Sequence, residues 1–221
     1  MSTRVETVIE AEGETSILLG WQTVSAKHED RPALEVLDML VDNGSSGILN
    51  LTLTTRQKVA AARSSPTFVK ESGWWELTAT AKEEQRPEDL EALLLSVVEA
   101  LKAGSFSDDD LAAVKLADEL RHQQMLESPG ARVSMMTDAV IQGRGWADVV
   151  ASRARLQAVT REDVLRVANE YLGGAYAVVK RVPGAPTLPK IEKPTISPVK
   201  LDPSREGEFS RRILGIEAPP I

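Results

Sequence analysis

The clearest pattern of apolar and polar positions runs from Leu156 to Gly184. Thr160 is placed as a helix N-cap, and Asp163, three residues later, can complete a capping box. Apolar residues then recur at helical spacing until Gly173-Gly174, where glycine allows the left-handed turn that ends a helix. The apolar run from Ala175 to Val182 predicts a buried strand. The apolar helix positions are Val164, Leu165, Val167, Ala168, Tyr171 and Leu172.

Alternation with a period of two predicts further strands. Residues 74–82 alternate most regularly, which places Trp75 with the apolar residues and Trp74 on the opposite, exposed face. Residues 4–11 and 16–24 predict two strands, and the short turn between them predicts that they pair as a hairpin. Weaker extended segments are expected at 59–63 and 67–69.

Helix start and stop signals divide the rest of the chain into helices. Proline near a first helical position, serine or aspartate before it, and glycine after the last apolar residue mark the ends. An acidic first turn favours the helix dipole. The expected helices span about residues 31–43, 45–56, 87–103, 107–127, 128–142, 146–156 and 160–172.

This order of elements predicts an α+β fold. Strands come early, several helices follow without interruption, and a last strand comes after them, so the helices are expected to pack on one face of a mainly antiparallel sheet. The opposite face of the sheet is then partly open or packs on another module.

The composition changes after Val182. Eight of the twelve prolines fall between Pro183 and Pro220, and such a stretch cannot sustain a helix or a central strand. We therefore predict one α+β module at residues 1–183 and a proline-rich linker or tail at 184–221. A short helix is expected within 204–214, and scattered apolar residues in the tail suggest that it lies along a groove.

Charge and composition exclude several function classes. The formal charge of −7 and the pI near 5.1 argue against a nucleic acid or an anionic membrane as partner. No stretch approaches the roughly 20 apolar residues of a membrane span. The chain has no cysteine, so it has no disulfide and no thiolate nucleophile. A soluble protein is expected, in either the cytoplasm or the periplasm of a bacterium.

Individual polar residues favour structural roles over chemistry. Glu119 and His122 have the i, i+3 spacing of metal ligands, but a solvated helix face explains them without a metal. His28-Glu29-Asp30 precedes a helix and suits capping, and Asp108-Asp109-Asp110 suits the helix dipole. Ser128 and Ser134 have no histidine at a spacing typical of a nucleophile, and Gly143-Arg144-Gly145 is too short to hold a phosphate.

Several segments together resemble the pitrilysin/insulinase family of zinc metallopeptidases. The resemblance covers roughly residues 4–184, in the order LVDNGSSGIL, RPEDLEAL, LESPGARVSMMTDAVIQG and AVTREDVLRVANEYL, ending at VPG. The Thr-x-x-Asp-Val…Ala…Tyr-Leu pattern from Thr160 to Leu172 matches most closely. Members consist of two or four similar modules around a chamber, and only the first module carries the zinc motif His-x-x-Glu-His.

The departures from the family pattern assign this chain to a non-catalytic module. Its two histidines, His28 and His122, lie in unrelated segments outside any His-x-x-Glu-His, whereas zinc needs about three protein ligands. The resemblance implies no cofactor in this chain and zinc in the parent protein. The proline-rich tail resembles the linker between the halves of four-module members, which implies the second module.

The resemblance also implies one weak substrate-binding residue. In some members, an arginine and a tyrosine seven residues apart reach from a supporting module to the substrate. Arg56 stands at the arginine position, and Arg63 stands where the tyrosine is expected. Only Arg56 remains a candidate for contact with an extended peptide.

Three functions remain open at this point. The first is a chamber module that packs against other modules of the same peptidase and holds peptide, in part by strand addition at a sheet edge. The second is a catalytically silent subunit of an assembly, as in the core subunits of a respiratory complex. The third is an unrelated α+β enzyme whose site the sequence does not reveal.

Overall fold

A computed structural model describes residues 3–185, 192, 194, 197 and 206–216. It contains one five-stranded sheet, in the order β1-β5-β2-β4-β3. Three of the four strand pairings are antiparallel and that of β1 with β5 is parallel. The strands are β1 Val5–Ala11, β2 Ser16–Thr23, β3 Ala61–Phe68, β4 Gly73–Thr80 and β5 Ala177–Pro183.

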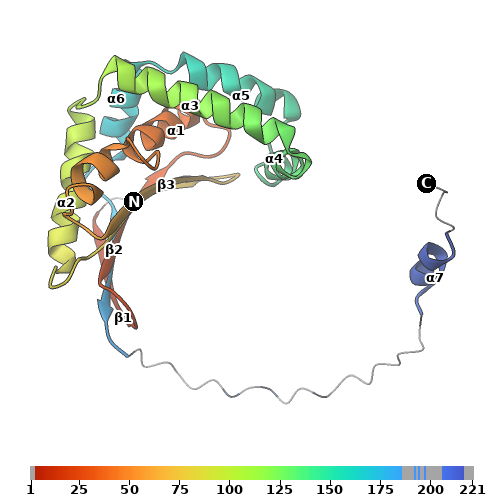
Figure 1. Ribbon diagram of the computed structural model, residues 1–221, viewed down its shortest axis with the longest axis horizontal. Helices are drawn as coiled ribbons and strands as arrows, with labels where there is room; N and C mark the ends of the chain where they lie inside the picture. Colours follow the sequence, from red (N-terminus) through yellow and green to blue (C-terminus); the bar gives the residue numbers. More distant parts are fainter. Residues whose placement is uncertain (1–2, 186–191, 193, 195–196, 198–205, 217–221) are drawn as a thin grey trace. The chain divides into compact units, whose positions relative to one another are not determined.

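The helices follow the predicted sequence of elements closely. The α+β prediction is confirmed, because the helices of residues 31–171 lie on one face of the mixed sheet, with α1, α2 and α6 in direct contact with it (Figure 1). The two extended segments predicted at 59–63 and 67–69 form one continuous strand, β3, in the structure. The helices are α1 Arg31–Val41, η1 Asn50–Thr54 (a single π-helical turn), α2 Pro87–Lys102, α3 Asp108–Glu127, α4 Pro129–Ile141, α5 Trp146–Ala158, α6 Arg161–Tyr171 and α7 Glu208–Leu214.

The predicted hairpin of residues 4–11 with 16–24 is wrong. β5 lies between the two strands, parallel to β1 and antiparallel to β2. A strand with consecutive apolar residues, such as Val178 and Val179, is best placed with a neighbour on each side, because the backbone groups of both its edges are then paired. Residues 12–15 form a connection wide enough to cross over one strand.

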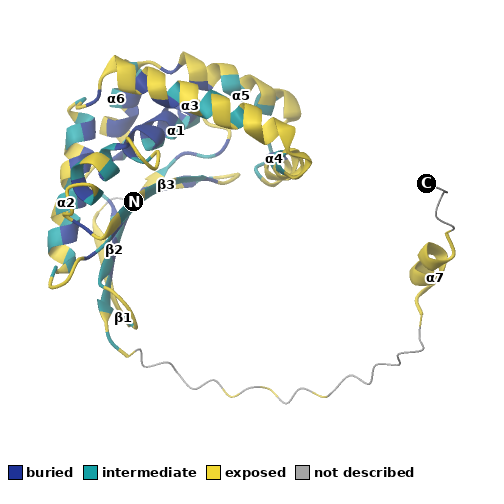
Figure 2. Ribbon diagram, viewed as in Figure 1, coloured by how far each residue is buried: buried dark blue, intermediate teal, exposed yellow. Residues whose placement is uncertain are grey.

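Side-chain alternation separates the two faces of the sheet. On the helix side, Ile17, Leu19 and Trp21 of β2 lie beside Trp75 and Leu77 of β4, each at most 2% exposed. These residues form the core with the inward faces of α1, α2 and α6. The prediction for the two neighbouring tryptophans is confirmed, since Trp75 is 1% exposed and Trp74 is 41% exposed. Figure 2 shows the buried residues gathered between the sheet and the helices.

Local capping signals place the helices as predicted. Thr160 Oγ1 accepts from the N–H of Asp163, and the Asp163 carboxylate accepts from the N–H of Thr160. Ser107 and Asp110 form the same reciprocal box at the start of α3. These contacts satisfy N–H groups that the first helical turn leaves free.

Asp30 has a different role from the one predicted. It occupies the N-cap position of α1, but its side chain makes no capping hydrogen bond. Instead, the buried carboxylate pairs with Arg166 and accepts a hydrogen bond from Tyr171 Oη at 2.7 Å, both on α6. The Arg166 guanidinium holds the pKa of Asp30 below its usual value. The residue therefore fastens α1 to α6.

A second charged cluster attaches β1 to the module. Lys180 on β5 is nearly buried, and its Nζ lies 3.0 Å from carboxylate oxygens of Glu6 on β1 and of Glu88 on α2. Arg4 bonds Glu91 of α2, which also accepts from Tyr176. β1 is thus held at its helix side mainly by ion pairs, while its own side chains are largely exposed.

The chain divides into two units, Met1–Pro186 and Thr187–Ile221. In the second unit the structure describes α7, which confirms a short helix within 204–214. The residues predicted to follow a groove, Leu188, Ile191, Ile196, Val199 and Leu201, lie outside the described residues. The role of 184–221 as a linker stays a prediction.

Replacing Asp30 by asparagine is expected to lower the free energy of unfolding by about 1–3 kcal/mol at neutral pH, because Arg166 and Tyr171 lose a buried anionic partner. The pKa of Asp30 is lowered in the folded protein, so its contribution is present above the unfolded pKa and is lost as pH falls. Urea unfolding at neutral and acidic pH measures this.

Glu170→Gln is the matched control, since Glu170 is the exposed second partner of Arg166. Glu170→Gln should have little effect on the free energy of unfolding. A cost for Asp30→Asn that stays constant down to low pH would contradict an ionic role.

Candidate functional site

The sheet face opposite the helices is uncovered in the described part of the chain. The strand registers align the outward residues of all five strands on this face. Several are apolar, including Val5 and Ile9 of β1, which are 52% and 43% exposed. Residues that share this face are Val5, Thr7, Ile9, Leu18, Gly20, Gln22, Ala61, Arg63, Ser65, Thr67, Trp74, Glu76, Thr78, Thr80, Ala177, Val179 and Arg181.

A shallow hollow of about 450 Å³ lies on this face between β2 and β4. Gly20 forms its floor, and Trp74 and Leu18 line its sides. A Cβ at Gly20 would have only Leu18 Cδ2, at 3.7 Å, within 4 Å, so the missing side chain leaves open space. Glycine inside a strand often marks a place where another group approaches closely. The uncovered face therefore has both an apolar surface and a depression that can take a side chain.

Arg56 lies in the turn that follows η1 and is exposed. It forms no ion pair or hydrogen bond with any described residue, so its guanidinium is available to a ligand. Arg63 is also exposed and lies on the uncovered face of β3, opposite Thr78 of β4. Nothing in the structure tests whether Arg56 contacts a peptide, and its role stays a prediction.

The outer edge of β3 is poorly suited to strand addition. The N–H of Ser64 is already bonded to Asp42 Oδ2 at 3.2 Å. Two residues later, Pro66 has no N–H to donate. An extended strand that paired here would find two donors in succession missing, so this edge does not favour a backbone ladder.

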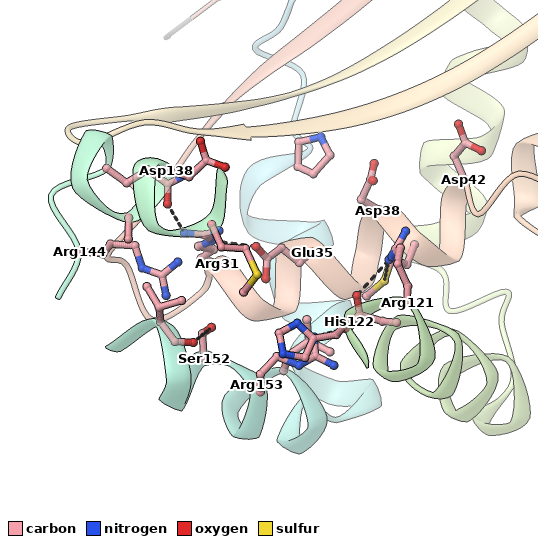
Figure 3. Close-up of a pocket in the computed structure, with 18 residues that line it drawn as sticks. Arg31, Glu35, Asp38, Asp42, Arg121, His122, Asp138, Arg144, Ser152 and Arg153 are labelled. Atoms are coloured by element: carbon pink, nitrogen blue, oxygen red, sulfur yellow. Dashed lines mark hydrogen bonds and ion pairs between the residues drawn. The ribbon is translucent and has the colours of Figure 1, made fainter. Parts of the chain in front are cut away.

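A polar cavity of about 400 Å³ lies on the helix side, between α1, α3, α4 and α5 (Figure 3). Its arginines are already paired with carboxylates of the same module. Arg31 Nε lies 2.8 Å from Glu35, Arg144 Nε lies 2.7 Å from Asp148, and Arg153 pairs with Asp118 and Glu119. The Arg153 pairs join α5 to α3, whereas the Arg31 and Arg144 pairs are local, so these three arginines have partners within the module.

Asp38, a carboxylate that lines this cavity, has a raised pKa. Its carboxylate accepts hydrogen bonds from Ser64 Oγ at 2.5 Å and from Trp75 Nε1 at 2.8 Å. Burial raises the pKa of Asp38 to about 6, and the nearby Asp42 carboxylate adds to the rise. Sequence patterns did not identify Asp38, because it lies in the polar part of an ordinary amphipathic helix and its partners come from β3 and β4.

Most residues considered for chemistry have structural roles. Glu119 keeps 38% of its side chain exposed, in agreement with the predicted solvated helix face, and it also pairs with Arg153 of α5 at 2.7 Å. Ser128 accepts from the N–H of Ala131 and caps α4. Gly143 has a φ of 66° and ends the same helix. Asp110 caps α3 as described above.

The described residues do not fit a zinc site. His28 lies 3.7 Å from Asp30 before α1, whereas His122 lines the polar cavity from α3. Across residues 3–185 and the short described stretches beyond, no three histidine or carboxylate side chains group to hold a metal ion. In the same residues, no helix is long and apolar enough to cross a membrane.

Comparison with known proteins gives a family match over more than half of the chain. The family described as "Peptidase M16 inactive domain" matches residues 2–117. The zinc protease PqqE of Helicobacter pylori is 25% identical over 158 residues, which cover 70% of this chain and 35% of that protein.

Two solved structures have the same fold. A protease from Helicobacter pylori superposes with a TM-score of 0.76 at 22% identity, covering 80% of this chain and 44% of that one. The inactive peptidase domain of a Bordetella parapertussis protein has a TM-score of 0.70 at 18% identity, covering 81% of this chain and 98% of that one. The chain thus spans less than half the length of both Helicobacter proteins.

Asp38→Asn is expected to change how stability depends on pH. The raised pKa means that the folded protein binds a proton more tightly at this site than the unfolded chain does, so stability from Asp38 is full at low pH and falls as pH rises toward about 6. Asparagine does not ionise, so the variant does not lose this stability as pH rises. Relative to wild type, the variant should gain about 2 kcal/mol of unfolding free energy between pH of about 4 and about 7.

The control is Asp138→Asn, an exposed carboxylate that lines the same cavity. Chemical denaturation across the pH range compares the three proteins. Parallel pH profiles for wild type and Asp38→Asn would show that Asp38 ionises normally.

Proposed function

The chain belongs to the peptidase M16 family, the pitrilysin/insulinase family that its sequence resembles, as an inactive domain, and from this we propose that it forms part of the wall of a peptide-binding chamber. Hydrolysis itself is then carried out by a zinc-binding module outside this chain. The observation that supports the proposal most directly is the uncovered sheet face.

The uncovered face has the properties that a wall of such a chamber needs. A single-domain protein normally buries both faces of a sheet or makes the outer one polar, because exposed apolar surface is costly in water. Here Trp74, Val5 and Ile9 remain exposed beside a hollow. The indole ring of tryptophan has apolar faces and an N–H donor at its edge, and this combination suits contacts with peptides of varied sequence.

We assign the peptide contact to side chains of this face and to Arg56. Arg56 has no partner within the described residues, so it can meet a carbonyl oxygen or a carboxylate of an extended peptide without first breaking an ion pair. The blocked outer edge of β3 argues against strand addition at this position. The substrate is therefore expected to lie over the face and not along this edge.

Zinc belongs to another module in this proposal. When bound there, the metal supplies an activated water for peptide hydrolysis. The two histidines of this chain stay structural, and the arginines of the polar cavity between α1, α3, α4 and α5 stay paired with carboxylates of the same chain. Other modules of the same peptidase are the proposed partners.

Trp74→Ala is expected to weaken peptide binding roughly tenfold, because a stacking surface of this size contributes about 1–1.5 kcal/mol. Arg56→Ala should weaken it about threefold to fivefold. Fluorescence anisotropy of fluorescein-labelled casein peptides, titrated with the full chain, measures both effects.

Trp146→Ala is the matched control, since Trp146 is 47% exposed, close to the 41% of Trp74, but begins α5 on the helix side. Equal losses for Trp74→Ala and Trp146→Ala would reject the uncovered face as the binding surface. Absence of any binding by the wild-type chain would favour the silent structural subunit.

The purified chain alone is expected not to hydrolyse peptides, with or without added Zn²⁺. Cleavage of a quenched fluorescent peptide measures activity, and a chelator removes adventitious metal. Chelator-sensitive cleavage that follows the purified chain through successive columns would contradict the assignment to an inactive module.

A further inference from the structure

β1 presents a free backbone edge. The N–H of Val5 donates to Tyr176 O at 3.0 Å, and Ala11 O accepts from the N–H of Gly184 at 3.2 Å. The backbone N–H and C=O groups of the odd-numbered residues therefore point toward β5. Successive peptide groups of a strand point in opposite directions. The peptide groups of Glu6, Val8 and Glu10 therefore point outward, and β1 is the last strand of the sheet on this side.

The two edges of the sheet differ in how they are protected. Edge strands are usually protected by proline, charge or a cover, because free N–H and C=O groups pair with other chains. β3 is protected by Pro66 and by the bond from Ser64 to Asp42. β1 contains no proline, its charged residues are Glu6, which is paired with Lys180, and Glu10, and it exposes apolar side chains on both faces, with Val8 at 55% and Val5 at 52%.

We propose that the free edge of β1 binds β1 of a second copy of this chain. The two strands pair antiparallel around a two-fold axis that passes through Thr7. In this register, the numbers of two residues that lie opposite each other add up to fourteen. Val5 faces Ile9 of the second copy, and Arg4 faces Glu10.

The charges along β1 and the length of the strand together favour this register. Outward peptide groups must meet each other, so only registers that pair even-numbered residues with even-numbered residues form hydrogen bonds. A two-fold axis at Glu6 would place Glu6 opposite itself, and an axis at Val8 would place Glu6 opposite Glu10. Both put like charges in direct opposition, which is unfavourable. The axis at Thr7 avoids this and instead opposes Arg4 to Glu10. An axis at Val5 or at Ile9 also avoids like charges, but it pairs only about five residues of each strand, so strand overlap together with charge favours the axis at Thr7.

Within the described part of the chain Glu10 is unpaired, and Arg4 can add it as a further partner through the exposed part of its guanidinium. Arg4 keeps 36% of its side chain exposed although it also bonds Glu91 and Glu6. Glu10 has no ion pair with any described residue. On the uncovered face, Val5 and Ile9 of one copy would cover Ile9 and Val5 of the other, with the Thr7 residues between them. The pattern is therefore self-complementary, as a two-fold contact requires.

The proposal does not depend on the peptide-binding role of the module. A single pair of seven-residue strands makes a small interface, so the expected dimer is weak and forms with a dissociation constant in roughly the micromolar range. Sedimentation of the full chain at rising concentration should show a monomer converting to a dimer. A chain that stays monomeric at about 100 µM would overturn the proposal.

A cysteine scan tests the register, because the natural chain has no cysteine. The two Thr7 residues would form a non-hydrogen-bonded pair, whose short Cα separation permits a disulfide. Thr7→Cys should therefore give a disulfide-linked dimer under mild oxidation at least tenfold faster than Glu10→Cys or Ser65→Cys. Ser65 lies on β3, at the other edge. Equal rates for the three variants would overturn the proposal.

Val8→Pro separates pairing from folding. The N–H of Val8 points outward, so proline removes no bond to β5 but removes a donor to the second copy. We expect an unchanged far-ultraviolet circular dichroism spectrum and a dimer at least tenfold weaker. A variant that remains folded and dimerises as well as wild type would show that the contact lies elsewhere.

Discussion

The packing of Trp21, Trp75 and Tyr176 fixes the rest of the module. The ring centroid of Trp21 lies 5.7 Å from that of Trp75 and 5.2 Å from that of Tyr176, and its Nε1 donates to Gly173 O. These contacts join β2, β4 and the turn between α6 and β5. Since side chains alternate along a strand, a shift of one residue would move Trp75 to the outside. The same constraint sends Trp74 to the uncovered face and leaves Gly20 as the floor of a hollow.

The sequence predicts those parts of the fold that depend on neighbours along the chain. The Thr160–Asp163 and Ser107–Asp110 boxes, the helix ends at glycine and the strand around Trp75 follow from contacts within a few residues. The pairing of β1 was missed because its partner, β5, is about 170 residues away. The role of Asp30 was missed for the same reason, since a capping position is visible locally but Arg166 and Tyr171 are not.

The candidate site was only partly accessible from sequence. The absence of a zinc motif and the match to an inactive module followed from short motifs. The uncovered face required the order of the strands, because only the register brings Leu18, Gly20, Trp74 and Val179 to one surface. Arg56 was found by resemblance alone. Asp38 required tertiary structure, since its raised pKa comes from burial beneath β3 and β4.

The unequal protection of the two sheet edges also limits how far association can proceed. A sheet that is open at both edges can add copies without end, which is the route to fibrils. Here the bond from Ser64 to Asp42 and the ring of Pro66 close one end of the sheet. Once β1 is paired with a second copy, both outer edges of the combined sheet are β3 strands, which do not offer a free row of N–H and C=O groups. Growth stops at ten strands, so an exposed apolar strand that would promote aggregation in another sheet produces a closed pair in this one.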